Sequence, residues 1–392
     1  MKLYTFGFRK TPSRTIGRAC AGAAVAILAA LAGATPSFAD QPYNLDEAVR
    51  QGVVDINFNP WAKRGVGPLT QKLAVVNPGL VNRIGFHYGG QSDEVLNAVG
   101  SAVAAIHKVV PRAIFGGGFN EAVYKSYNGH LACGGNLGTQ TFAADQLASK
   151  TSLGSNGEFV DISKPRVQDY YVCIGQISID KDMVYLHFEA PSLVIRAASG
   201  GPESAYAAYK SVESRLREYA ASKGKAVYFS GDMELAAHVP LEGMYLPSRF
   251  YHVTIPKFIP YQNRIPNPGV GVGYTYALSD RIIADTRKET PPRTRILFYV
   301  DNWDPKQDDL RRVMELDGVN RRKLYLLSAQ NAIKGGAYFI PPLVLCQGCI
   351  APKDVGDPCE LLDSATSEYD ALACDDLDGI RRALDAEAGH RL

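Results

Sequence analysis

The stretch that decides the fold is residues 158–189, EFVDISKPRVQDYYVCIGQISIDKDMVYLHFE. Its first half predicts a helix that opens at Ser163 and Pro165, because a proline in the first turn leaves no hydrogen bond unmade. The inner face of this helix is apolar, with Val167, Tyr170, Tyr171, Ile174 and Ile177. Its second half ends in VYLHF, residues 184–188, where β-branched and aromatic side chains predict a buried strand. A helix that leads into a buried strand is one unit of an α/β fold.

The same alternation of helix and strand recurs along the chain. One predicted helix is capped by Ser92 and stopped by Pro111, and another ends at Gly224. The predicted strands are Arg83–Tyr88, Ala113–Gly117, Val184–Phe188, Ala226–Phe229, Tyr251–Ile255, Arg295–Val300 and Tyr338–Leu345. Either Val53–Phe58 or Val270–Tyr276 supplies an eighth, and a helix from Asp308 to about Ala332 separates the last two. This pattern predicts an α/β chain folded as a (β/α)8 TIM-like barrel over residues 40–345.

An open, doubly wound sheet is the alternative fold. Such a sheet usually carries a G-x-G-x-x-G turn after its first strand, whereas Gly89-Gly90 and Gly116-Gly117-Gly118 lack that spacing. Two stretches, residues 118–160 and 256–294, are longer than ordinary connections. We expect them to be functional loops at the carboxyl ends of the strands, where the active sites of barrels lie.

The first 39 residues predict a signal peptide. They carry five basic residues and no acidic one, then an uncharged run from Ala21 to Ala34 that is too short to span a bilayer, and Ser-Phe-Ala before Asp40. Without them, 37 basic residues face 40 acidic ones, a net charge of −3. We therefore expect a secreted or periplasmic protein without a stable membrane anchor after cleavage. The sequence has no dense stripe of Lys and Arg, so we expect no nucleic-acid partner.

Six cysteines remain after the leader: Cys133, Cys173, Cys346, Cys349, Cys359 and Cys374. An even number in an oxidising compartment favours disulfides, at most three. The last four could instead be a thiolate zinc site, but their spacing is not that of a zinc ribbon. We expect disulfides that tie a C-terminal extension, residues 346–392, onto the barrel.

Polar residues at the carboxyl ends of the strands are the candidate site residues. Glu189 ends the strand at 184–188, and alternation places it on the same side as His187. Asp232 and Asp301 end two later strands, so we predict Glu189, Asp301 and Asp232 as catalytic residues. The predicted substrate-binding residues are His87, Tyr88, Asn120, Glu121, His187, His252, Asn302 and Trp303. Carboxylates beside aromatic rings suit carbohydrate chemistry, in which two carboxyl groups flank the scissile bond.

Two other chemistries are weaker alternatives. His87, His187 and His252 lie in three predicted strands and could bind a metal, but the H-x-H opening of metallohydrolase barrels is replaced by His87-Tyr88-Gly89. A serine hydrolase would need a G-x-S-x-G elbow, which the sequence lacks. We therefore predict neither a metal nor another cofactor.

Residues 158–189 also carry a family resemblance. The segments EFVDISKPRV, YY, ID and HFE resemble a pattern of glycoside-hydrolase-like barrels, which read approximately D-x-S-N-P-x-V, Y-x, I-D-x-G-x-D-G-I-H-F-D-E. Lys164 replaces the usual Asn, and Glu189 stands alone rather than in an acidic pair. The resemblance implies a TIM barrel with Glu189 at the active site. We therefore expect an exported enzyme that cleaves glycosidic bonds in a poly- or oligosaccharide. A non-catalytic carbohydrate-binding barrel and a metal-dependent hydrolase are the alternatives.

Overall fold

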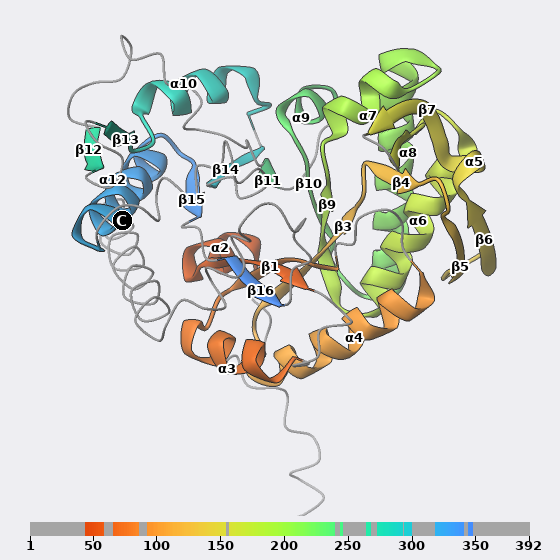
Figure 1. Ribbon diagram of the computed structural model, residues 1–392, viewed down its shortest axis with the longest axis horizontal. Helices are drawn as coiled ribbons and strands as arrows, with labels where there is room; N and C mark the ends of the chain where they lie inside the picture. The colour runs from red at the N-terminus through yellow and green to blue at the C-terminus, as the bar shows by residue number, and fades with distance from the viewer. Residues whose placement is uncertain are drawn as a thin grey trace, which may run out of the picture. The chain divides into compact units, whose positions relative to one another are not determined.

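The structure is a computed structural model. It describes residues 44–58, 66–85, 92–153, 157–239, 244–245, 264–267, 273–292, 294–299, 318–340 and 344–347. Within these residues the fold is α/β, as predicted, and the six-stranded sheet and one of the two three-stranded sheets are parallel (Figure 1).

The main sheet has six parallel strands in the order β10-β9-β3-β2-β1-β16. They are β1 (Val53–Phe58), β2 (Leu80–Gly85), β3 (Ile114–Phe119), β9 (Met183–Phe188), β10 (Tyr228–Ser230) and β16 (Val344–Gln347). A second parallel sheet has the order β11-β14-β15, with β11 (Met244–Tyr245), β14 (Arg295–Tyr299) and β15 (Tyr338–Ile340). When only the strands of the two parallel sheets are considered, neighbours in each sheet are also neighbours in the chain. The exception is β16, which joins the edge beside β1. β10 also contacts β11.

Most of the strands are connected by helices. These are α2 (Leu45–Gln51), α3 (Gly67–Val76), α4 (Asp93–His107), α6 (Pro165–Asp180), α7 (Pro191–Ala197), α8 (Gly201–Ser222), α9 (Met233–His238), α10 (Asp280–Glu289) and α12 (Gly318–Lys334). The predicted end signals are confirmed. The Ser92 hydroxyl accepts a hydrogen bond from the Val95 N–H, Pro165 is the first residue of α6, and Gly224 follows α8 with a positive φ. Glycine tolerates that left-handed conformation better than any other residue.

The core has two layers that share the strands. Alternate strand residues face outward and pack against the helices, as Phe119 and Phe188 do beside Tyr171 of α6. The other residues form one inner cluster, to which strands of both parallel sheets contribute and against which α2 packs. Its members are Leu45, Ala48, Val49, Val53, Leu80, Ile114, Tyr185 and Leu297, with Val184, Tyr228 and Tyr338 at its margin.

The segment 118–160 is not the long loop that the sequence suggested. It contains four-residue helix α5 (Ala144–Leu147) and five short strands: β4 (Ala122–Tyr124), β5 (Asn128–Ala132), β6 (Thr139–Ala143), β7 (Ala148–Leu153) and β8 (Gly157–Val160). β5 and β6 form an antiparallel hairpin, and β4, β8 and β7 form an antiparallel sheet. These strands are only three to six residues long, and β5, β6 and β7 carry many exposed residues, so the sequence resembles that of a loop.

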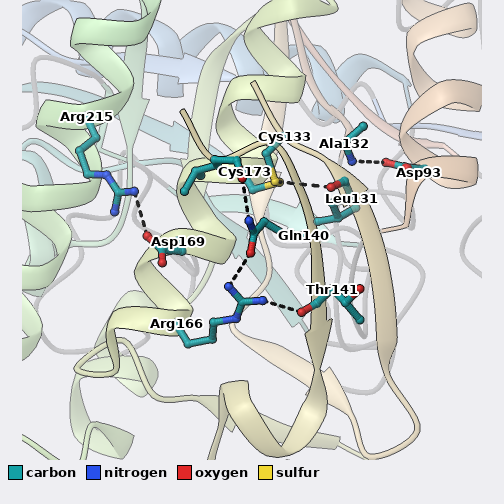
Figure 2. Close-up of a disulfide and its surroundings, with 11 residues drawn as sticks. Asp93, Leu131, Ala132, Cys133, Gln140, Thr141, Arg166, Asp169, Cys173 and Arg215 are labelled. Carbon is teal, nitrogen blue, oxygen red and sulfur yellow. Dashed lines mark hydrogen bonds and ion pairs between the residues drawn. A yellow bond between two sulfur atoms is a disulfide. The ribbon is translucent and has the colours of Figure 1, made fainter. Parts of the chain in front are cut away.

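A disulfide joins this inserted segment to α6. Cys133, which follows β5, is bonded to Cys173, with 4.8 Å between the two Cα atoms. Figure 2 shows that Arg166 of α6 also reaches the insertion, where it donates to the Gln140 side chain (2.8 Å) and to the Thr141 carbonyl. The disulfide that the structure shows is therefore internal, and it does not tether a C-terminal tail. Cys349, Cys359 and Cys374 lie outside the described residues.

Three further expectations are corrected or refined. The eighth strand is Val53–Phe58, because Gly273–Tyr276 (β13) pairs with β12 (Arg264–Asn267) in a separate antiparallel hairpin. The predicted strand 251–255 lies outside the described residues, and β11 takes the position beside β14. β16 runs across the predicted boundary at 345, since its Cys346 pairs with Asn57 of β1. Within the described residues, no helix is long and apolar enough to cross a membrane.

Candidate active site

The parallel register arranges the inner face of the main sheet in rows. Gly118 of β3 is the partner of His187 of β9, and His187 is the partner of Ser230 of β10. One row nearer the amino ends, Gly116 pairs with Tyr185, which belongs to the inner cluster. Because successive side chains in a strand alternate between its two faces, Gly118, His187 and Ser230 share the inner face with Tyr185.

Glu189 lies immediately beyond this row, at the carboxyl end of β9. Its N–H donates to the Phe119 carbonyl (3.1 Å), so the pairing of β3 and β9 continues to Glu189. One of its carboxylate oxygens is 3.2 Å from Nε2 of His187, and the Glu189 side chain remains 18% exposed. The prediction that His187 and Glu189 share a side is confirmed by this contact.

His187 itself is buried, and its ring is held at both nitrogens. Nδ1 is 2.9 Å from the hydroxyl oxygen of Ser230, a side chain with no solvent exposure. The three side chains therefore form a chain of contacts, Ser230 to His187 to Glu189, in which only Glu189 reaches solvent to any extent. The sequence did not single out Ser230, because its position beside His187 depends on the pairing of β10 with β9.

Asn120 stands beside Glu189 in the continued register of β3. The Asn120 side chain is 1% exposed, and neither its amide nitrogen nor its amide oxygen has a hydrogen-bond partner within the described structure. Its backbone carbonyl accepts a hydrogen bond from the Tyr171 hydroxyl (2.7 Å), which fixes the strand end. A buried amide without partners costs about 1–3 kcal/mol.

Glu121 is buried, and its negative charge acts on Tyr171 and Tyr209, two tyrosines of the helix layer. Burial is the main cause that raises the pKa of each tyrosine well above its usual value, and the charge of Glu121 adds to the shift.

Asp232, a predicted catalytic residue, is engaged in holding helices together. One carboxylate oxygen caps α9 by accepting from the Leu235 N–H (3.1 Å), and the other accepts from the Ser192 N–H (2.8 Å) and the Ser192 hydroxyl. This geometry accounts for Asp232 as a helix cap that joins α9 to α7. We therefore do not assign it a catalytic role.

The remaining predicted site residues are His87, Tyr88, His252, Asp301, Asn302 and Trp303, and all of them lie outside the described residues. Of the three strand histidines considered as metal ligands, the structure thus describes His187 alone. The described part of the chain contains no group of three His, Cys, Asp or Glu side chains that could hold a metal ion.

Comparison with known proteins gives matches in structure. No family model matches the sequence, and no curated protein matches it. Amy13B of Eubacterium rectale is 8% identical over 85% of this chain and 79% of its own, with a TM-score of 0.50. The glycoside hydrolase domain of PelA from Pseudomonas aeruginosa is 10% identical over 78% of this chain and 99% of its own, with a TM-score of 0.41.

A family 5 xyloglucanase from Paenibacillus pabuli is 8% identical over 85% of this chain and 99% of its own, with a TM-score of 0.45. The names of the last two proteins describe a glycoside hydrolase domain and a xyloglucanase. At such low identity, the similarity to Amy13B shows the fold alone. The chain is an α/β protein whose fold is shared with Amy13B.

Proposed function

We propose that this chain is an exported glycoside hydrolase-like enzyme that cleaves glycosidic bonds in a poly- or oligosaccharide, with Glu189 as its nucleophile or general base. One observation carries the proposal. The partly exposed carboxylate of Glu189 lies at the carboxyl end of parallel strand β9, and the buried ring of His187 contacts it. Polar residues at that end of the strands are where barrel enzymes carry out their chemistry.

The inner cluster supports a closed (β/α)8 barrel as the scaffold. Its side chains come from β1, β2, β3 and β9 in one sheet and from β14 in the other. Strands of two sheets can pack their inner faces into one cluster when the sheets curve round a common axis. The contact between β10 and β11 joins one pair of sheet edges. Only three residues separate β15 from β16, and a contact between these two strands would close the barrel.

The reaction would use two carboxyl groups. Glu189, or a water molecule that it deprotonates, attacks the anomeric carbon while the second group protonates the departing glycosidic oxygen. Asp232 is committed to capping α9, so we propose Asp301, which ends β14 in the sequence, as the second carboxyl group. The distance between the two groups would decide between retention and inversion of the anomeric configuration.

Asn120 would bind a hydroxyl pair of the sugar. Its amide offers a donor and an acceptor side by side. One sugar hydroxyl can accept from the amide nitrogen while its neighbour donates to the amide oxygen. A substrate that supplied both partners would relieve the cost of the buried, unpaired amide. This contact would place a sugar ring in the row next to Glu189.

The test is an activity screen of the mature protein, residues 40–392, on a panel of glycans, with and without EDTA. Glu189→Gln should lower kcat at least a hundredfold, because the variant keeps the shape of the side chain but not its charge. The matched control is Glu203→Gln, on the exposed first turn of α8, which should keep wild-type turnover. Turnover by Glu189→Gln at the wild-type rate would overturn the proposal. Loss of wild-type turnover in EDTA would favour the metal-dependent alternative.

A second candidate is a barrel that binds carbohydrate without cleaving it. One of the carboxylates predicted as catalytic, Asp232, caps a helix instead. Binding of an oligosaccharide by the wild-type protein without cleavage of any glycan on the panel would favour this candidate.

A further inference from the structure

Behind Glu189 lies a buried pair of polar side chains that the proposed reaction does not itself require. Ser230 has no solvent exposure and His187 is 5% exposed, and the hydroxyl oxygen of Ser230 is 2.9 Å from Nδ1 of His187. The other ring nitrogen, Nε2, is 3.2 Å from the Glu189 carboxylate. Burying polar groups is costly unless they are hydrogen-bonded; here Nδ1 is hydrogen-bonded to Ser230, and Nε2 lies at ion-pair distance from Glu189.

The strand register explains why an imidazole fits at this point. His187 has Ser230 as its neighbour on β10 and Gly118 as its neighbour on β3. Because Gly118 has no side chain, β3 leaves space on the inner face beside the ring. Ser230 has a small side chain that leaves room for the ring, and its hydroxyl can still reach Nδ1. The flanking residues Leu186 and Phe188 point to the helix layer, which fixes the direction of His187.

The two partners also determine which ring nitrogen carries the proton. An ionised carboxylate offers only lone pairs, so a ring with its proton on Nε2 is the form that the 3.2 Å contact with Glu189 favours. In a neutral ring Nδ1 is then an acceptor, and the Ser230 hydroxyl is able to donate to it. A serine in this position therefore holds the tautomer that directs an N–H at Glu189.

We propose that Ser230 and His187 form a positioning dyad that fixes the rotamer of Glu189 and holds it in its carboxylate form. The inference deepens the proposed function and rests on it, because it assigns Glu189 the role of the ionised partner rather than the general acid. His187 is thereby a positioning residue rather than the substrate contact that the sequence predicted, since both of its nitrogens are engaged within the protein.

A pair of variants of equal shape separates this role from packing. His187→Gln keeps an N–H donor at nearly the position of Nε2, whereas His187→Met fills similar space without a donor. We expect His187→Met to lower kcat between about tenfold and a hundredfold with little change in KM, since a hydrogen bond to a charged group contributes about 1.5–3 kcal/mol. His187→Gln should restore kcat to within about fivefold of the wild type. Equal losses in the two variants, or no loss in His187→Met, would overturn the dyad.

Ser230→Ala tests the second link. Alone it should lower kcat by about three- to tenfold, and in a His187→Met background it should have no further effect, because the two residues act through one contact. Additive effects in the double variant would contradict the inference.

A spectroscopic measurement does not depend on enzyme activity. In ¹⁵N NMR spectra of the histidine rings, assigned by the loss of one signal pair in His187→Gln, His187 should be protonated at Nε2 and unprotonated at Nδ1. Ser230→Ala should shift the Nδ1 signal, because Nδ1 loses its donor. A ring protonated at Nδ1 alone would overturn the dyad even if Glu189 proved essential. If instead the tautomer is as expected but Glu189→Gln keeps full turnover, the proposed function fails and the arrangement of the ring stands.

Discussion

The two ends of the parallel strands differ in what they contribute. At the amino ends, Val53, Leu80 and Ile114 are buried in a hydrophobic cluster together with residues of α2. At the carboxyl ends, the same inner face carries His187 and Ser230 with Glu189 beyond them. β9 contributes to both, since its Tyr185 belongs to the apolar cluster and Glu189 lies only four residues later. If the proposed function holds, stability and chemistry are separated along the strands, and we expect each end to tolerate change without loss at the other.

The largest stability effect is expected at the amino ends. Leu80→Ala removes a fully buried side chain from the inner cluster and should lower the free energy of unfolding by about 2–5 kcal/mol. Urea denaturation measures this loss. Turnover at a temperature where the variant stays folded should match that of the wild type. A large loss of turnover in the folded variant would show that the two ends are coupled.

The disulfide of the insertion is expected to contribute next. Cys133→Ala combined with Cys173→Ala should lower the free energy of unfolding by about 2–4 kcal/mol, mainly because the unfolded chain regains freedom. The thermal midpoint of the wild type should fall in a reducing agent, whereas that of the double variant should not change. Equal midpoints for the wild type with and without reductant would show that the disulfide does not constrain the unfolded chain.

Substitutions of Asp232 test whether this carboxylate is structural, in contrast to the proposed catalytic role of Glu189. Asp232→Ala should lose the cap of α9 and about 0.5–2 kcal/mol of stability, whereas Asp232→Asn should keep most of the cap, because both residues are good N-caps. If Asp232 is structural, Asp232→Asn keeps wild-type turnover. A stable Asp232→Asn protein that has lost turnover at least a hundredfold would make Asp232 a catalytic acid after all.

The smallest effect concerns Asp46 of α2. The Arg295 guanidinium, which donates from Nε to Asp46 at 2.6 Å, is the main cause that lowers the pKa of this carboxyl. A carboxyl with a lowered pKa stabilises the folded chain fully above its unfolded pKa, near 3.9, and loses that contribution as the pH falls through its lower folded pKa. Since both side chains are about one-third exposed, we expect at most about 1 kcal/mol.

The measurement is the thermal midpoint of the wild type and of Asp46→Asn across that pH range. The wild type should be the more stable protein at pH 6, and the difference should vanish well below pH 4. A difference that does not depend on pH would assign the effect to something other than the charge of Asp46.

The sequence predicted those features that depend on local chemistry. Ser92 caps the first turn of α4, and Pro165 is the first residue of α6, so each marks a helix start through local chemistry. The run 184–188 is apolar enough to indicate a buried strand by itself. Alternation alone placed His187 and Glu189 on one side, and the 3.2 Å contact confirms it.

What the sequence could not predict depends on the register between distant strands. Ser230 becomes significant only because β10 pairs with β9, and a lone serine at a strand end carries no local signal. Asp232 looked like Glu189 in the sequence, since each follows a strand, and only the contact with Ser192 of α7 distinguishes them. The strands within 118–160 are short, and several of them are polar and exposed, so the sequence resembles that of a loop.

The most direct test of the central claim is the crystal structure of Glu189→Gln with an oligosaccharide that the wild type cleaves. The variant should bind the substrate without turning it over. We predict a sugar ring with its anomeric carbon beside the side chain at 189 and with two hydroxyl groups within about 3 Å of the Asn120 amide. A sugar bound away from the carboxyl ends of β3 and β9, with the Asn120 amide paired only to water, would contradict the account.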